Sequence, residues 1–252
     1  MPRESGGGTN QSFRILVLGD SLSFGQGVAE GERYSDILEA KLRANYPAFP
    51  IEVINLGIPG FETVQEEKIL YRMWDIVRPD LTVIQFYPND TNVTYDHFFP
   101  YKIQVPSRLR PFLERFLLFR VLEPWYDRPY RWLKDIPTYG EVQRRSRNVE
   151  SRDWKLFAQS VRNIGRWVTD HSQQFPFVLF LTDEVGKRDD FYLHVRKMLE
   201  GNGFNWVEPE VTRYLPISRF EFHPNAEMHR AYAESLLKAI VQSHQFKGLP
   251  AH

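Results

Sequence analysis

A short apolar run that ends abruptly in a polar turn is the feature that most constrains the fold. Residues 14–18 read Arg-Ile-Leu-Val-Leu and are followed at once by Gly19, Asp20 and Ser21. Such a run is typical of a buried strand in a parallel sheet, and open α/β sheets bind their ligands where these strands end. Ser21 is therefore the first candidate nucleophile. Glycine, aspartate and serine are also ordinary turn and helix-cap residues, so the turn alone predicts no chemistry.

Apolar runs and helical periodicities alternate along most of the remaining chain. Strands are expected at 13–18, 51–56, 81–87, 176–181 and 204–207, and helices at 34–46, 63–77, 152–175, 187–199 and 226–241. A strand, a helix and a second strand in succession imply a right-handed parallel unit. The expected fold class is α/β, with a parallel sheet of about five strands.

Composition favours a single domain. A chain of 252 residues with 42% hydrophobic content can bury one large core, which we assign to 13–243. Residues 1–12 are polar and glycine-rich and are expected to form a flexible lead-in, and 244–252 a C-terminal tail. The lead-in has no apolar segment typical of a signal peptide or a membrane span. The lead-in also fits a junction left when a signal peptide or an anchor is removed, so the sequence does not determine the cellular compartment.

Residues 93–150 break the alternation of strands and helices. They are dense in prolines, aromatic residues and arginines, and are too long for an ordinary connection. Within 101–150 there are eleven Lys or Arg and six Asp or Glu, and apolar residues recur at helical spacing from 109 to 117. We expect an aromatic, basic helical insertion that caps the core. A lid over an acyl chain or sugar, or a patch resting on a membrane surface, are the alternatives.

Charge and cysteine content exclude several classes of function. Lys plus Arg equal Asp plus Glu at 32 each, so no overall field attracts nucleic acid, and a small molecule or neutral polymer fits better as the partner. The chain has no cysteine, which excludes disulfides and thiolate catalysis. His223, Glu227 and His229 lie close in sequence, but their spacing is not a recognised ligand pattern, and no metal is expected.

A serine nucleophile needs a base, and position selects one of the seven histidines. His223 is followed by Pro224 in a loop just before the closing helix, so it can lean over the sheet edge; its plain role would be a helix-entry turn residue. Five others fall in expected helices or the tail, where solvated or packed roles are ordinary: His171, His194, His229, His244 and His252.

Acyl chemistry at a serine also requires neutral donors aimed at a developing oxyanion. A glycine permits close approach of a backbone N–H, and an asparagine amide supplies a side-chain donor. Gly57 and Asn89 follow the expected strands on either side of the Ser21 turn. Each also has a plain explanation as a turn residue.

Four blocks, taken in order, resemble the Ser, Gly, Asn and His blocks of the SGNH (GDSL-type) hydrolase family: Gly19-Asp20-Ser21-Leu22-Ser23, Gly57 after Asn55-Leu56, Asn89-Asp90, and His223-Pro224-Asn225. The resemblance covers nearly the whole chain outside the insertion. It implies a three-layer α/β/α, flavodoxin-like fold and acyl transfer through an acyl-serine, without metal or cofactor.

The resemblance assigns roles to these residues. It makes Ser21 the nucleophile and His223 the base that later protonates the leaving alcohol. The oxyanion hole would consist of the Ser21 N–H, the Gly57 N–H and the Asn89 side-chain amide. Asp20 and Asp90 are expected to shape their loops rather than react.

The acidic member of the triad departs from the common family pattern. Many members place it three positions before the histidine, and here that position is Phe220. Glu221 lies two before the histidine, which resembles the Asp-x-His variant of the pattern in bacterial members of the family. We therefore assign Glu221 to hold the Nδ1–H of His223. A backbone carbonyl in its place, leaving a Ser-His dyad, is the alternative.

The resemblance favours a serine esterase that removes a short acyl group, such as acetyl, from a carbohydrate or small ester. The alternatives are an O-acyltransferase acting on an envelope glycan, a lipase or lysophospholipase, and a glycan-binding module that no longer turns over. By analogy with bacterial relatives of envelope or exopolysaccharide chemistry, an envelope or secreted location is favoured. Acyl length, alcohol and oligomeric state stay open.

Overall fold

The computed structural model describes residues 12–93, 144, 146–172, 174–182, 190–218 and 221–243. The insertion expected at 93–150 lies largely outside these ranges, as do most of the lead-in and the tail. The prediction of a helical cap therefore stays a prediction.

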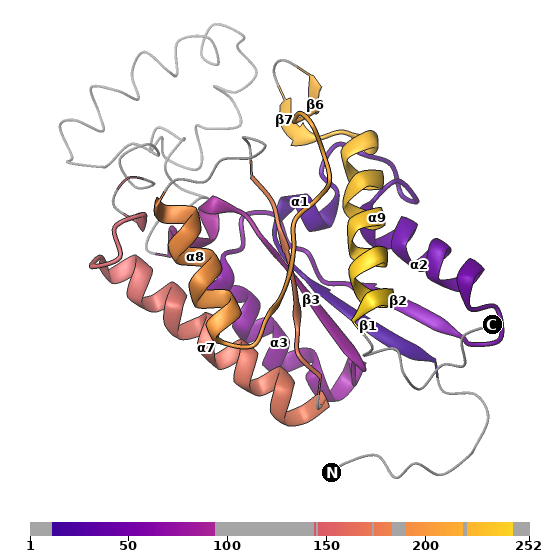
Figure 1. Cartoon of the computed structure of the whole chain (residues 1–252), viewed down its shortest axis with the longest axis horizontal. Coiled ribbons are helices and arrows are strands. Elements are labelled where there is room, and N and C mark those ends of the chain that lie inside the picture. Colours follow the sequence, from indigo (N-terminus) through magenta and orange to yellow (C-terminus); the bar gives the residue numbers. More distant parts are fainter. Residues whose placement is uncertain are drawn as a thin grey trace, which may run out of the picture.

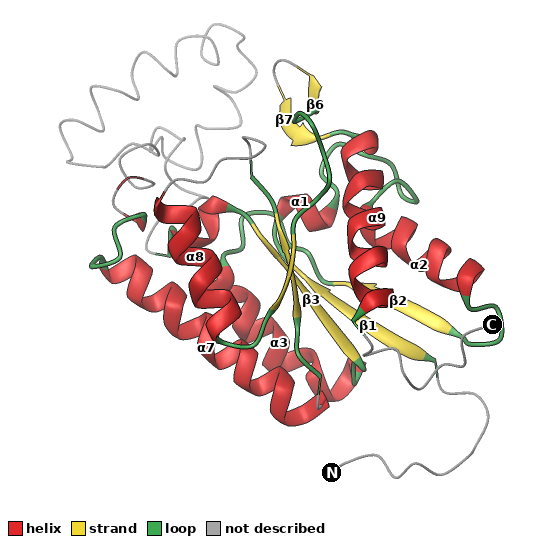
Figure 2. Ribbon diagram, viewed as in Figure 1, coloured by secondary structure: helices red, strands yellow, loops and turns green. Residues whose placement is uncertain are grey.

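A five-stranded parallel sheet forms the centre of the molecule (Figure 2). Its strands lie in the order β2-β1-β3-β4-β5 and comprise β1 (Phe13–Leu18), β2 (Ile51–Asn55), β3 (Leu81–Phe86), β4 (Phe177–Phe180) and β5 (Asn205–Val207). Val17 of β1 lies opposite both Asn55 of β2 and Val83 of β3. The polar turns after these three strands therefore meet at one edge of the sheet.

Helices cover both faces of the sheet (Figure 1). On one face lie α2 (Tyr34–Asn45) and α9 (Ala226–Gln242), and on the other α3 (Thr63–Val77), α7 (Arg152–Ser172) and α8 (Asp190–Gly201). Because successive side chains of a strand point to opposite faces, Ile15 and Val17 join the first core cluster and Leu16 and Leu18 the second. This is the expected three-layer α/β/α arrangement.

The strand and helix boundaries expected from the sequence differ from the observed ones by at most three residues, but four short elements were missed. They are α1 (Ser21–Phe24), the 3-10 helix η1 (Pro88–Thr91), and the antiparallel pair of β6 (Pro216–Ser218) and β7 (Glu221–Pro224). His223 therefore lies in a strand and not in the loop that the sequence predicted. Strands of three or four residues are too short to show an alternating pattern, and Pro224 stands at the end of β7, where proline is tolerated.

None of the helices within the described ranges has the length and apolar character needed to cross a membrane.

Candidate active site

Ser21 opens a four-residue helix at the carboxyl edge of the sheet. Asp20 caps α1, because its Oδ1 accepts a hydrogen bond from the Leu22 N–H at 2.9 Å. Gly25 ends the helix with a φ of 79°, in the left-handed region that favours glycine. Among the described residues the Ser21 N–H has no acceptor, as is usual in the first turn of a helix. The candidate nucleophile and a free backbone donor thus come from one residue.

The strand β7 presents an acid and a base toward Ser21. Since side chains alternate along a strand, Glu221 and His223 share one side of β7, and Phe222 between them is 74% exposed. His223 Nε2 lies 2.9 Å from Ser21 Oγ, and His223 Nδ1 lies 2.5 Å from Glu221 Oε1. With Nδ1–H donating to Glu221, Nε2 is the atom left to accept the Ser21 hydroxyl. The three side chains form one hydrogen-bonded line.

Glu221 is held in its charged form. The hydrogen bond from the His223 side chain, and after it the one from the His223 backbone N–H, lowers the pKa of Glu221 below its usual range. Its side chain is 43% exposed, so water screens the pair. A carboxylate at this place favours the tautomer of His223 that can accept the serine proton.

Asn89 lies beside the nucleophile turn. It follows Pro88 in η1, and its Nδ2 donates to Asp20 Oδ2 at 3.0 Å. The amide has a second N–H, which no acceptor in the described part of the chain engages. Asp20 itself is 1% exposed, and burial raises its pKa despite the hydrogen bonds it accepts from Asn89 and Leu22.

Gly57 packs directly against α1. A Cβ at this position would lie 2.5 Å from the Phe24 nitrogen and 2.7 Å from Ser23 Cβ, so only glycine fits without a shift of α1. Its N–H donates to Asn55 Oδ1 at 2.8 Å. Gly60, to which the sequence analysis gave no role, has a φ of 78° in the same loop, and its N–H has no acceptor among the described residues. Of these two glycines, Gly57 thus has an occupied N–H and Gly60 a free one.

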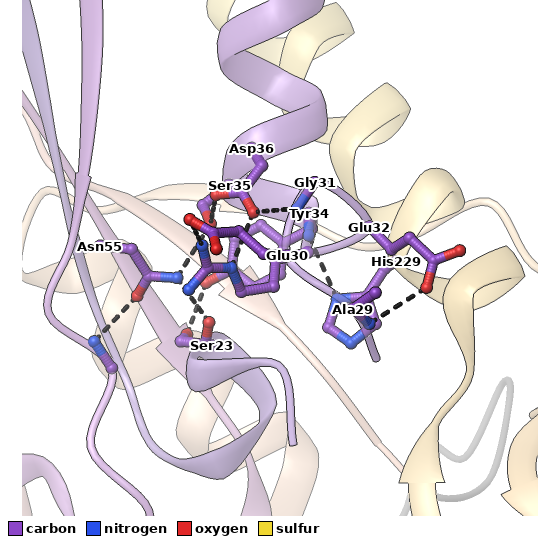
Figure 3. A network of polar contacts seen from close by, with 12 residues as sticks. Ser23, Ala29, Glu30, Gly31, Glu32, Tyr34, Ser35, Asp36, Asn55 and His229 are labelled. Carbon is purple, nitrogen blue, oxygen red and sulfur yellow. Dashed lines mark hydrogen bonds and ion pairs between the residues drawn. The ribbon is translucent and has the colours of Figure 1, made fainter. Parts of the chain in front are cut away.

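A buried polar network beside α1 was not foreseen, and Figure 3 shows its Ser23 and Tyr34 side chains. Ser23 Oγ is 2.5 Å from the Tyr34 hydroxyl and donates to Gln85 Oε1 at 3.2 Å, and all three residues are fully buried. Gln85 Oε1 also accepts from the Asp20 N–H at 3.1 Å. The available signal was a glutamine in the apolar run of β3, because buried polar side chains are rarely left without partners.

Two further carboxyl groups lie buried near Asp20 and were not singled out as a cluster. Glu66 is 2% exposed, and neither of its carboxylate oxygens has a hydrogen-bond partner in the structure. Asp90 is fully buried, and its Oδ2 accepts from the Tyr87 N–H at 2.7 Å. Burial raises the pKa of both groups well above the usual range, and the charges of neighbouring carboxylates, Asp20 among them, raise it further.

Other histidines in the described ranges have packed or solvated positions. His171 and His194 each contact a carbonyl of their own helix, at Trp167 and Asp190. His229 is fully buried, its Nδ1 accepts from the Tyr34 N–H, and burial lowers its pKa to about 4. Within these ranges, no group of three His, Asp or Glu side chains is arranged to hold a metal ion.

Comparison with known families gives one match along most of the chain. The model of the family described as GDSL-like lipase/acylhydrolase matches residues 15–236. The comparison with curated proteins finds no match.

Solved structures show the same fold at low sequence identity. A two-domain esterase (CEX) active on acetylated mannans has a TM-score of 0.53 and 13% identity, over 95% of this chain and 51% of its own. This chain thus spans about half the length of that esterase. The lipase Lip_vut3 from a goat rumen metagenome gives a TM-score of 0.54 and 14% identity, over 90% of this chain and 97% of its own. The protein TesA has a TM-score of 0.51 and 12% identity, over 94% of this chain and 99% of its own.

Proposed function

This chain belongs to the GDSL-like lipase/acylhydrolase family and is an esterase, and we propose that it removes a short acyl group, such as acetyl, from a carbohydrate or another small alcohol. The hydrogen-bonded line from Ser21 Oγ through His223 to Glu221, with distances of 2.9 and 2.5 Å, carries the proposal. These are the contacts that a serine nucleophile needs from a base and that the base needs from an acid.

The proposed reaction has two halves. His223 Nε2 takes the proton from Ser21 Oγ as that oxygen attacks the ester carbonyl carbon, and the carbonyl electron pair moves onto oxygen. The tetrahedral intermediate then expels the alcohol, which receives the proton from His223, and leaves an acyl-serine. A water molecule gives a proton to His223 and attacks the acyl carbon; the second tetrahedral intermediate then releases the acid as His223 returns that proton to Ser21 Oγ, which restores both side chains.

The Ser21 N–H and the free N–H of the Asn89 amide are the proposed oxyanion donors from the nucleophile side. We retain Gly57 as the donor from the facing loop, where its N–H would have to be shared with Asn55. Gly60 is the alternative donor in that loop, since its N–H is free. Gly60→Ala keeps this N–H but is strained at a φ of 78°, so it should displace the donor and lower kcat for an acetyl ester about 10- to 100-fold if Gly60 supplies it, whereas unchanged kcat would leave Gly57 as the donor of this loop.

A fluorophosphonate probe tests the nucleophile. We expect one equivalent of label on the wild-type chain and none on Ser21→Ala, whose thermal unfolding should match the wild type. Hydrolysis of small acetyl esters should disappear in the same variant. Absence of labelling in the folded wild-type protein would contradict the proposal and favour a binding module.

A lipase-type preference for longer acyl chains is the second candidate, and Phe24 is the observation that favours it. Residues three apart share a helix face, so Phe24 lies on the same side of α1 as Ser21, and it is 50% exposed. An apolar ring beside the nucleophile could contact an acyl chain or the apolar face of a sugar.

Rates on acetate through decanoate esters of one alcohol separate the two candidates. Phe24→Ala should weaken activity equally at all chain lengths if the acyl group is short and the ring meets the alcohol. A loss that grows with acyl length would instead support the lipase-type candidate. Phe222→Ala is the matched control, because this equally apolar ring lies on the opposite side of β7 from His223.

A further inference from the structure

The helix α1 that bears the nucleophile is too short to hold itself in place. Its four residues form few internal hydrogen bonds, and a helix of this length is unstable without tertiary contacts. Its last carbonyl groups, including that of Ser23, lack the partners that a longer helix would supply. The position of Ser21 therefore depends on groups outside the helix.

One side chain supplies such a contact from the strand next to β1. Asn55, the last residue of β2, donates from Nδ2 to the Ser23 carbonyl oxygen at 2.6 Å and to Ser35 Oγ at 2.8 Å. Its Oδ1 accepts from the Gly57 N–H at 2.8 Å. One amide thus joins the nucleophile helix, the start of α2 and the loop between β2 and α3, as Figure 3 shows.

Both donors of the amide and one of its acceptor sites are in use, so the side chain is fixed in a single orientation. The opposite side of α1 is held by Gln85, which contacts Ser23 and Asp20. The two amides come from the strands on either side of β1. Asn55 is the one that also contacts the β2–α3 loop, whose Gly57 packs against α1.

We propose that Asn55 is a positioning residue, which sets the distance between the Ser21 nucleophile and the oxyanion donors of the β2–α3 loop. The inference rests on the proposed esterase function for its kinetic readout. Substrate affinity does not depend on this distance, because the substrate carbonyl meets the donors fully only in the transition state. Loss of Asn55 should therefore lower kcat and leave KM nearly unchanged.

Asn55→Asp is the sharpest substitution. It keeps the shape and the acceptor for the Gly57 N–H, and it replaces the donor to the Ser23 carbonyl with an oxygen that cannot donate. We expect kcat for an acetyl ester to fall about 10- to 100-fold with KM within about threefold, since a displacement near 1 Å can have such an effect. Asn55→Ala should lower kcat by a similar factor. The rate of fluorophosphonate labelling at Ser21 should fall in both variants.

Ser35→Ala is the matched control. It removes a hydrogen bond from the same amide but leaves the contacts of Asn55 with Ser23 and Gly57 in place. We expect the melting temperature of Ser35→Ala to fall about as much as that of the Asn55 variants. Its kcat should stay within about twofold of the wild type.

Three results would overturn the proposal. They are equal kcat in the Asn55 variants and Ser35→Ala, a rise in KM that accounts for the whole loss, or failure of both Asn55 variants to fold while Ser35→Ala folds. The last result would assign Asn55 a purely structural role. If the wild type labels at Ser21 but hydrolyses no ester, the proposed function fails, and the labelling rates still test Asn55.

Discussion

The nucleophile and the base of the candidate site are held by regions of opposite character. Ser21 stands on a turn whose neighbours Asp20, Ser23 and Gln85 are buried and hydrogen-bonded to one another. His223 stands on a two-stranded hairpin in which Glu221 is 43% and Phe222 74% exposed. The comparison teaches that changes near Ser21 should reduce both stability and rate, whereas changes near His223 should reduce rate alone.

Specific contacts still fix the position of the hairpin of β6 and β7 next to α1. A Cβ at Gly27, just beyond α1, would lie 2.0 Å from Ile217 Cδ1 of β6, so glycine allows the hairpin to approach. The Tyr214 hydroxyl donates to the Phe222 carbonyl oxygen at 2.5 Å and ties β7 to the preceding segment. These few contacts orient His223 without burying it.

The largest expected effect is that of His223→Ala. Removing the base should lower kcat/KM for an acetyl ester by roughly 10⁴- to 10⁶-fold, the range for loss of a member of a serine triad. Because the hairpin is exposed, the melting temperature should stay within about 2 °C of the wild type. Rates and thermal unfolding measured on one preparation test both statements, and a large loss of stability would break the comparison.

Glu221→Gln should have the next largest effect and lower kcat/KM for an acetyl ester about 10- to 100-fold. This loss is smaller than for a buried triad acid, because water screens the pair of Glu221 and His223. The His223 hydrogen bond lowers the pKa of Glu221, so the carboxylate persists to lower pH than usual. The ratio of wild-type to variant rate should thus be constant from about pH 5 upward and shrink toward one as the carboxylate protonates in acid. Retention of nearly full activity would favour the Ser-His dyad.

On the Ser21 side of the site, Ser23→Ala should reduce both the stability of the fold and kcat. It removes the partner of the buried Tyr34 hydroxyl, and an unsatisfied buried group costs about 1–3 kcal/mol. We also expect kcat to fall about tenfold, because α1 loses its contact with Gln85. A folded variant with wild-type kcat and a lower melting temperature would show that the buried network serves stability alone.

The smallest expected effect is a gain in stability from Glu66→Gln. Burial raises the pKa of Glu66, so wild-type stability is highest when this group is protonated and falls as pH rises through the pKa of the unfolded chain toward that of the folded state. Glutamine has no charge to bury. We expect a melting temperature higher by about 2–4 °C near pH 8, and no difference near pH 4, for a change of about 1 kcal/mol.

Local pattern was enough to predict an α/β fold with a parallel sheet, and the resemblance of four short motifs to a known family predicted the family, the three-layer arrangement and the enzyme class. Apolar runs such as 81–86 and helical spacing such as that of 63–77 depend on a strand or a helix having one buried face, which sequence shows directly. The structure also brings Ser21, His223 and Glu221 together as expected, although their catalytic roles stay proposals. Glu221 was selected from the resemblance to family members whose acid lies two positions before the histidine, and the structure adds the reason that this spacing works, because residues two apart share a side of β7.

The remaining features depend on contacts between distant segments. The Ser23–Gln85 hydrogen bond joins residues 62 apart and the Asn55–Ser23 bond residues 32 apart, so no window of sequence contains both partners. The hairpin of β6 and β7 has strands too short for a pattern. The bond from the Gly57 N–H to Asn55 joins residues only two apart, yet it was also missed, because a turn sequence does not show which way the Asn55 side chain points.

The hydrogen bond between Ser21 and His223 spans 202 residues, and this separation has a consequence for biosynthesis. A ribosome makes the chain from its N-terminus, so all five strands of the central sheet, which end at Val207, are complete before the hairpin is translated. Ser21 is thus made well before His223. On the proposed mechanism, hydrolysis can begin only once the hairpin has been translated, after the framework that orients Ser21 has been synthesised.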